Sequence, residues 1–146
     1  MMKVLGNVPG TPAGGYHVVA DISATNTVQA KPDDNAMDIA IAMVSDGSRG
    51  LPVVGEDYEF LGFISEGDVI RALEAGVDLN RAKARDIMNT AFVGVEENTP
   101  LASVSRLFEM GFQLLPVVQD GKVVRSITRH DVLRARLGLG PTIDEK

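Results

Sequence analysis

Leu51-Pro52-Val53-Val54 returns as Leu115-Pro116-Val117-Val118, 64 residues further along the chain. Gly47 and Gly111 keep the same spacing of 64 residues. Residues on either side also recur, at spacings of 63 or 65 residues. These recurring pairs are Ile64/Ile127, Asp68/Asp131, Val69/Val132, Arg71/Arg134, Ala72/Ala135, Asp21/Asp86, Ile22/Ile87 and Thr25/Thr90. Because three blocks recur in one order at almost constant spacing, the chain contains two copies of one unit.

An amphipathic helix is predicted before each repeated block. In both copies the apolar residues follow the i, i+3, i+4, i+7 spacing of one helix face. They are Ala36, Ile39, Ala40, Met43 and Val44 in the first copy, and Leu101, Val104, Leu107 and Phe108 in the second. Asp33 or Asp34 is expected to cap the first helix. Thr99 is expected to cap the second, with Pro100 at its first helical position. Gly47 and Gly111 should end these helices in the left-handed conformation.

Two strands and a second helix are predicted after the first helix of each copy. The strands are Leu51–Val54 and Phe60–Ile64 in the first copy, and Leu114–Val118 and Val123–Ile127 in the second. Asp120-Gly121 is a strong signal for a two-residue hairpin turn, and residues 55–59 make a longer turn in the first copy. The second helices should begin at Ser65 and Thr128 and end near Gly76 and Gly138.

With a leading strand in each copy, the expected order is strand, helix, strand, strand, helix. The predicted fold class is therefore α+β (an α/β-type sandwich). Neither copy has enough apolar surface to be stable alone, so the two repeats should pack face to face with pseudo-two-fold symmetry. The expected organisation is a flexible arm at 1–16, repeat 1 at 17–76, a linker at 77–83, repeat 2 at 84–137 and a tail at 138–146.

Composition excludes several classes of protein. The chain of 146 residues has no cysteine, which excludes disulfides, cysteine-ligated zinc and a thiol nucleophile. Its net charge of −6 argues against nucleic acid as a partner. The longest strongly apolar run, Ile39–Val44, is too short to span a membrane. No signal peptide is apparent at the N-terminus, so a cytoplasmic protein is expected.

The two copies resemble cystathionine-β-synthase (CBS) domains, and Val18–Arg136 resembles a tandem CBS pair, or Bateman module. The segments that carry the resemblance are Ala84–Met88, Leu115–Val118 and Ser126–Leu133 in copy two, and Gly62–Val69 in copy one. The resemblance implies a non-catalytic regulatory module that binds AMP, ADP, ATP or S-adenosylmethionine in clefts between the repeats. It also implies a homodimer. A separate effector protein is expected, because the chain contains no further domain to regulate.

The Ser65–Asp68 and Thr128–Asp131 segments are the candidate ribose and phosphate sites. A carboxylate can accept hydrogen bonds from both hydroxyls of a ribose, and charge-assisted hydrogen bonds are strong. The hydroxyl of Ser65 or Thr128 adds a contact at a helix start that favours phosphate. The same pattern is a capping box that needs no ligand. The two interpretations are compatible, since a capping Thr can still contact a ligand.

The resemblance also implies two apolar slots for adenine. One is lined by Asn89–Phe92 with Leu115 and Pro116, and the other by Ile22–Thr25 with Leu51 and Pro52. The alternative interpretation is that these are core residues, which is favoured for the prolines and the valines that follow them because apolar strand residues are mostly buried.

Candidate phosphate contacts are Arg129, His130 and Arg49, although a solvated His130 at the helix start is an equal alternative. Arg71 and Arg134 are expected to form surface ion pairs. The family pattern has a glycine three residues before the Ser or Thr. It is present as Gly62 in copy one and replaced by Arg125 in copy two, where a long side chain either fills the cleft or contacts phosphate. Glu66 should repel phosphate in copy one, so the sites are unequal and Thr128–Asp131 is the better phosphate site.

Two other functions are alternatives to the nucleotide sensor. One is a ligand-free structural or protein-interaction module of the same fold. The other is an enzyme, which is disfavoured because the chain has only two histidines, no cysteine and no P-loop, nucleophile-elbow or HExxH motif. Asp68 and Asp131 occupy equivalent positions in the two repeats, which suits two binding sites better than one reaction centre.

Overall fold

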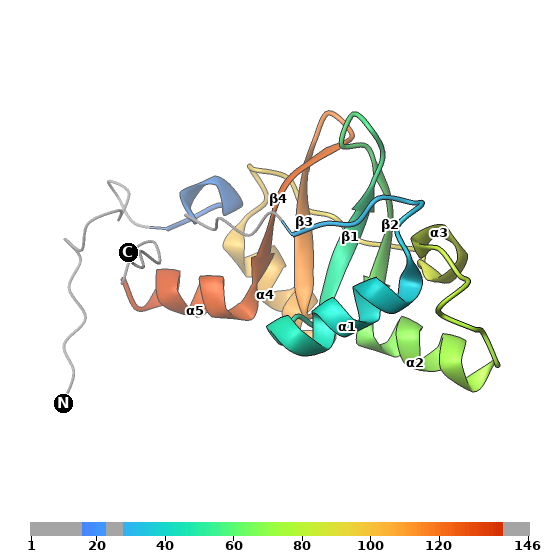
Figure 1. Cartoon of the computed structure of the whole chain (residues 1–146). Helices are drawn as coiled ribbons and strands as arrows, with labels where there is room; N and C mark the ends of the chain where they lie inside the picture. Colours follow the sequence, from blue (N-terminus) through green and yellow to red (C-terminus); the bar gives the residue numbers. More distant parts are fainter. Residues whose placement is uncertain (1–15, 23–27, 139–146) are drawn as a thin grey trace.

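The computed structural model describes residues 16–22 and 28–138 (Figure 1). In chain order the elements are η1 (Val19–Asp21), α1 (Ala36–Asp46), β1 (Gly50–Val54), β2 (Phe60–Ser65), α2 (Glu66–Glu74), α3 (Ala84–Ile87), α4 (Leu101–Glu109), β3 (Leu114–Gln119), β4 (Lys122–Thr128) and α5 (Arg129–Arg136). The predicted arm and tail lie outside the described residues except for Tyr16, which packs against the second core, and Gly138. The mixture of helix and strand in two repeats confirms the predicted fold class.

Each repeat contributes a two-stranded antiparallel sheet, β1 with β2 and β3 with β4. Leu51 pairs with Ile64, and Leu115 pairs with Ile127, so the duplicated blocks occupy equivalent register positions. The predicted leading strand of each repeat is reduced to a single parallel bridge, from residue 30 to Val53 and from residue 95 to Val117. The tips of the two hairpins also contact each other, because the Val123 amide donates to the Tyr58 carbonyl at 2.8 Å.

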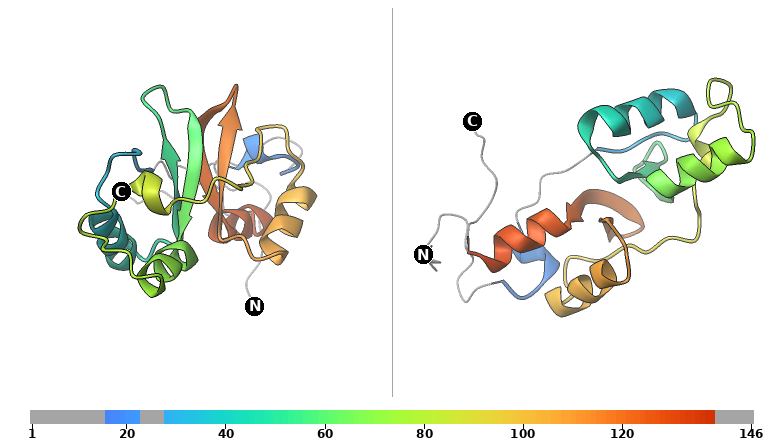
Figure 2. Two further views of the ribbon diagram at one scale, coloured as in Figure 1. Left: turned by 90° about the vertical axis from the view of Figure 1, so that its right-hand side faces the viewer. Right: turned by 90° about the horizontal axis from the view of Figure 1, so that it is seen from below.

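The two hairpins stand side by side at the centre of the molecule (Figure 2, left). Helices α1 and α2 cover the first hairpin, while α4 and α5 cover the second. Fully buried strand residues of the two repeats, Ile64 and Ile127, lie in separate hydrophobic clusters. Each repeat therefore has its own core, and the two sheets meet between these cores.

The opening segment of each repeat packs on the core of the other repeat (Figure 2, right). Val19 and Ile22 are buried in the second core, and Ala84 and Ile87 from α3 are buried in the first. Backbone hydrogen bonds also join each opening segment to the other repeat. They are Val19 N–H to Thr99 O (2.9 Å), Leu101 N–H to His17 O (2.9 Å), Ala84 N–H to Asp34 O (2.8 Å) and Ala36 N–H to Ala82 O (2.9 Å). Each folded lobe thus contains chain from both sequence repeats.

The two opening segments also begin with the same side-chain contact. The Asp21 carboxylate accepts the amide N–H groups of His17 (2.9 Å) and Val18 (3.1 Å). Those two hydrogen bonds lower the pKa of Asp21 below its usual value. At the equivalent position Asp86 accepts the Lys83 amide at 2.8 Å.

The cap predicted for α1 is wrong. Asn35 caps this helix by accepting the Asp38 amide at 3.0 Å. Asp34 instead accepts the Lys31 amide at 2.9 Å in the preceding turn, and Asp33 forms an ion pair with Arg85. Both carboxylates are therefore engaged upstream of the helix start.

The cap predicted for α4 is also wrong. Thr99 accepts the Glu96 amide at 2.9 Å and gives α4 no cap. Pro100 lies at the N-cap, one residue before its predicted position. The Thr99 hydroxyl, which was expected to cap the helix, instead closes the turn at Glu96–Thr99.

The predicted helix ends and the hairpin turn are confirmed. Gly47 and Gly111 have φ of 70° and 108°, in the left-handed region that only glycine adopts at little cost. Asp120 and Gly121 have φ of 54° and 79°, the two positive values of a type I′ turn. The stripe on α1 is correct except at Val44, which is 85% exposed.

None of the helices in the described part of the chain has the length and apolarity that crossing a bilayer requires. The same residues contain no cluster of three or more His, Cys, Asp or Glu side chains placed to hold a metal ion.

Candidate functional site

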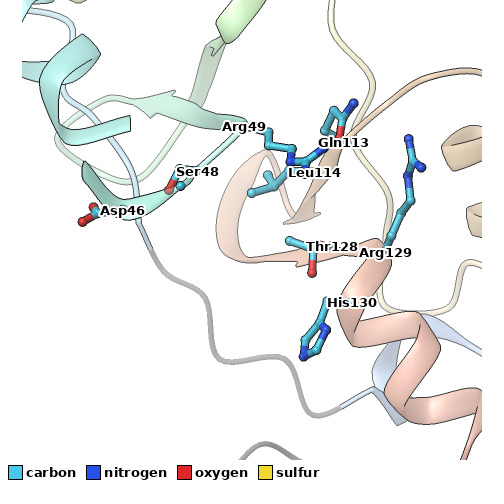
Figure 3. Close-up of a pocket in the computed structure, with 9 residues that line it drawn as sticks. Asp46, Ser48, Arg49, Gln113, Leu114, Thr128, Arg129 and His130 are labelled. Carbon is cyan, nitrogen blue, oxygen red and sulfur yellow. Dashed lines mark hydrogen bonds between the residues drawn. The ribbon is translucent and has the colours of Figure 1, made fainter. Parts of the chain in front are cut away.

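Two clefts lie where β2 runs into α2 and where β4 runs into α5. The Ser65 cleft has a volume of about 200 Å³ and is lined by Arg49, Phe63, Ser65, Asp68, Arg71, Asn89, Ala91, Phe92, Val93, Gly111, Phe112, Gln113 and Leu114. The Thr128 cleft has a volume of about 440 Å³ and is lined by Asp46, Gly47, Ser48, Arg49, Gln113, Leu114, Thr128, Arg129 and His130. Figure 3 shows the second set, with Arg49 next to Gln113 and with His130 and Arg129 at the start of α5.

Both strand-to-helix junctions form complete capping boxes. Asp68 Oδ2 accepts the Ser65 amide (2.8 Å) and hydroxyl (2.9 Å), while Ser65 Oγ accepts the Asp68 amide (3.2 Å). Asp131 Oδ2 makes the same contacts with the Thr128 amide (2.9 Å) and hydroxyl (3.1 Å). The capping interpretation of both segments therefore describes real contacts, and each carboxylate is held in one orientation by them.

The two carboxylates differ in their second oxygen. Asp68 Oδ1 accepts a hydrogen bond from the Arg71 guanidinium at 2.5 Å, so both of its oxygens are engaged. Within the described residues every hydrogen bond of Asp131 uses Oδ2. Asp131 Oδ1 therefore accepts no hydrogen bond within the described residues, and Thr128, not Asp131, lines the cleft.

The predicted adenine segment Asn89–Phe92 contributes to the lining of the Ser65 cleft. Asn89 exchanges backbone hydrogen bonds with Phe63 on β2 (2.9 and 2.8 Å), which places Phe92 in the Ser65 cleft. Leu114, which directly precedes the predicted Leu115 and Pro116, lines the same cleft as Phe92. This placement follows from the exchange of opening segments, because the chain after α3 runs along the first repeat.

The four strand residues assigned to adenine lie in the core and line neither cleft. Leu115 and Leu51 are 0% and 5% exposed, and Pro116 and Pro52 are fully buried. The core interpretation is therefore correct for these positions. Leu114, one residue earlier, lines both clefts instead. Ile22 is buried in the second core, and residues 23–25 of the other predicted slot lie outside the described residues.

Gly62 and Arg125 have different structural roles. A Cβ at Gly62 would lie 2.8 Å from Met88 Sδ, so the glycine lets the segment after α3 lie against β2. Arg125 donates to the Ile22 carbonyl (2.6 Å) and to Glu97 Oε1 (2.6 Å). Its guanidinium therefore anchors the opening segment on the second lobe, and Arg125 lines neither of the two clefts.

Several cleft residues were not predicted from the sequence. Phe63 and Phe112 give the Ser65 cleft an aromatic lining together with Phe92, and Gln113 lines both clefts. One signal for Gln113 was available, because it stands 64 residues after Arg49, the spacing of the duplication. Glu66 lines the groove between α1 and α2 and does not line the Ser65 cleft, so the phosphate repulsion expected from it stays a prediction.

Comparison with known proteins decides the family. The family model for the CBS domain matches residues 19–75 and 84–138. The chain belongs to the CBS domain family. Its CBS pair is 30% identical to an uncharacterized protein of Methanopyrus kandleri over 131 residues, covering 88% of this chain and 67% of that protein. It is 29% identical to the chloroplastic CBS domain-containing protein CBSX1 of Arabidopsis thaliana over 158 residues, covering 87% and 67%.

An arabinose 5-phosphate isomerase of Yersinia pestis is 31% identical over 121 residues, which cover 80% of this chain but 37% of the isomerase. Two solved structures resemble the CBS pair more fully. CBSX2 in complex with AMP has a TM-score of 0.70 and 28% identity, covering 84% of this chain and 97% of that one. A CBS domain pair in complex with 5′-methylthioadenosine and S-adenosyl-L-methionine has a TM-score of 0.66 and 25% identity, covering 80% and 93%.

The clefts of this CBS pair differ in their positive charge. Arg49, Arg129 and His130 line the Thr128 cleft, with Asp46 as its one acidic lining residue. The Ser65 cleft contains Arg49 and Arg71, and Arg71 is already paired with Asp68. An anion therefore finds more unengaged positive charge in the Thr128 cleft.

Proposed function

We propose that this CBS pair is a regulatory module that binds an adenine nucleotide in the Thr128 cleft and signals to a separate effector protein. The observation that carries the proposal is that Thr128, which is held by Asp131 in a capping box, lines a cleft together with Arg49, Arg129 and His130. A carboxylate oxygen suits the ribose hydroxyls, and the arginines suit the phosphate. Within this proposal the module acts by binding and catalyses no reaction.

The class of ligand is supported by the solved relatives. One was crystallised with AMP, and another with 5′-methylthioadenosine and S-adenosyl-L-methionine. The cations of the Thr128 cleft favour AMP, ADP or ATP there over a ligand without phosphate. The Ser65 cleft, with Phe63, Phe92 and Phe112 in its lining, suits a nucleoside with little negative charge.

A thermal-shift panel tests the sensor. At 100 times its dissociation constant, AMP, ADP or ATP should add about 2.7 kcal/mol to the free energy of unfolding. S-adenosylmethionine and NAD complete the panel, with inorganic phosphate as the control for simple anion binding. If none of these nucleotides raises the melting temperature, the sensor proposal fails and the ligand-free interaction module takes its place.

We further propose a homodimer that buries the face between α1 and α2. A groove of about 490 Å³ there is lined mainly by apolar side chains. Ile41, Val44, Ile70 and Leu73 are 53% to 85% exposed on this face. So large an exposed apolar surface is typical of a protein–protein interface. A second copy is the proposed occupant because a self-complementary apolar face closes in a symmetric pair.

Val44→Glu should convert the dimer to monomer, because two carboxylates would be buried in the symmetric interface. Sedimentation velocity across a range of protein concentrations measures the change. Val124→Glu is the matched control, since Val124 is 42% exposed on β4 outside this groove. A variant that dimerises as well as wild type, or a wild-type chain that stays monomeric, would overturn the proposed interface.

A further inference from the structure

We infer that Arg49 is a phosphate ligand shared by the two clefts, so that a nucleotide bound in one cleft weakens the binding of phosphate in the other. The inference rests on the proposed nucleotide binding and adds a coupling between the two sites. Arg49 lines both the Ser65 cleft and the Thr128 cleft.

Arg49 lies at the boundary between the two clefts, where it is hydrogen-bonded to Gln113. Its Nη1 donates to Gln113 Oε1 at 3.0 Å, and Gln113 also lines both clefts. The two residues are equivalent positions of the duplication, 64 residues apart. The hydrogen bond therefore joins the segments that precede β1 and β3, at the wall common to the two sites (Figure 3).

The guanidinium of Arg49 is free to change partner. Arg49 is exposed, and its Nη1 donates to a neutral amide, that of Gln113. A phosphate makes charge-assisted hydrogen bonds that are stronger than a bond to an amide oxygen. A nucleotide phosphate in the Thr128 cleft should therefore draw Arg49 away from Gln113 and hold it there.

Phosphate binding in the Ser65 cleft depends more on Arg49 than phosphate binding in the Thr128 cleft does. Its other lining cation, Arg71, is held by Asp68 at 2.5 Å, whereas the Thr128 cleft also has Arg129. Once Arg49 is taken, the Ser65 cleft retains its aromatic lining but loses its available cation. It should then accept a phosphate-free nucleoside such as adenosine and bind AMP poorly.

Titration calorimetry with AMP and adenosine tests the coupling. In the Asp131→Ala variant the Thr128 cleft binds AMP more weakly, and the AMP affinity of the Ser65 cleft, measured while the Thr128 cleft is still empty, is the uncoupled reference. In wild type the second AMP should bind about tenfold or more weakly than this reference, the scale of one hydrogen bond to a charged group. Adenosine should bind the Ser65 cleft equally well in the variant and in AMP-saturated wild type.

Arg49→Gln separates competition for one arginine from repulsion between two phosphates. If Arg49 is shared, Arg49→Gln binds AMP more weakly than wild type. The affinity of Arg49→Gln for its second AMP should then equal the AMP affinity of the double variant Arg49→Gln/Asp131→Ala, because no coupling remains. If repulsion causes the difference, loss of a cation leaves it unchanged or enlarges it, and the inference is overturned. Arg81→Gln removes the same charge from a site that lines neither cleft and should retain the wild-type coupling.

Other outcomes are also decisive. Two equal AMP sites in wild type, or no AMP binding to the Ser65 cleft of Asp131→Ala, would overturn the shared ligand while leaving a nucleotide-binding module in place. If wild type binds neither AMP nor adenosine, the proposed function itself fails and the coupling fails with it.

Discussion

Ile64→Ala and Ile127→Ala should each lower the free energy of unfolding by about 2–5 kcal/mol and should each shift the same unfolding transition. The two side chains are 0% exposed and occupy equivalent places in the two cores. Removing three carbons from either leaves a cavity in a close-packed interior. The two substitutions are matched in chemistry, burial and register. A difference between their losses in free energy of unfolding would therefore reflect a difference in packing between the two lobes.

The single transition follows from the exchanged opening segments. Val19 is buried in the second core, and Ala84 is buried in the first. Unfolding either lobe therefore removes packing from a segment that belongs to the other repeat. Calorimetry and denaturant titration followed by far-UV circular dichroism should coincide for wild type and both variants.

The control is Val124→Ala, at a residue that is 42% exposed, with an expected loss of about 0.5 kcal/mol or less. Two resolved transitions, each moved by only one of the isoleucine variants, would show that the lobes unfold independently. That result would contradict the coupling assigned to the exchange.

Asp131→Ala should weaken AMP binding to the Thr128 cleft by about tenfold or more, because it removes the acceptor proposed for the ribose hydroxyls. It should also lower the free energy of unfolding by about 0.5–2 kcal/mol, because Asp131 Oδ2 accepts the Thr128 amide at 2.9 Å at the start of α5. Calorimetric titration measures the first effect and denaturant unfolding the second.

Asp86→Ala separates these effects. Asp86 Oδ2 accepts the Lys83 amide at 2.8 Å, the same capping contact at the start of α3, and Lys83 lines neither cleft, whereas Thr128, which Asp131 holds, lines the Thr128 cleft. This variant should lose similar stability and keep wild-type affinity for AMP. Equal losses of affinity in the two variants would mean that Asp131 acts only through folding. An unchanged affinity in Asp131→Ala would show that the ribose site is misplaced.

Local chemistry explains the elements that the sequence predicted well. Gly47 and Gly111 end helices because glycine takes positive φ at little cost. Asp120-Gly121 makes the type I′ turn because aspartate, like glycine, tolerates the left-handed conformation. The Ser65 and Thr128 junctions were found because a capping box needs residues only three apart. Each of these signals depends only on residues a few positions apart in the sequence, so it can be recognised without the tertiary structure.

The caps of α1 and α4 show where such local signals mislead. Asp34 and Thr99 are good capping residues, yet each accepts an amide from a turn just upstream. Several adjacent polar side chains competed for the same role, and the tertiary path of the incoming chain selected among them. Asn35 and Pro100 occupy the N-cap positions as a result.

The duplication, the hairpins and the two Ser/Thr-x-x-Asp junctions could be predicted from the sequence, because each depends on residues close together in the chain or on their repetition. The packing of each opening segment on the opposite lobe, which places Phe92 in the Ser65 cleft, is visible only in the folded structure, as is the contact of Arg49 with Gln113. These contacts join residues far apart in the chain. Their partners are chosen by which apolar surface the connecting segments can bury, and the pattern along the chain does not specify that surface.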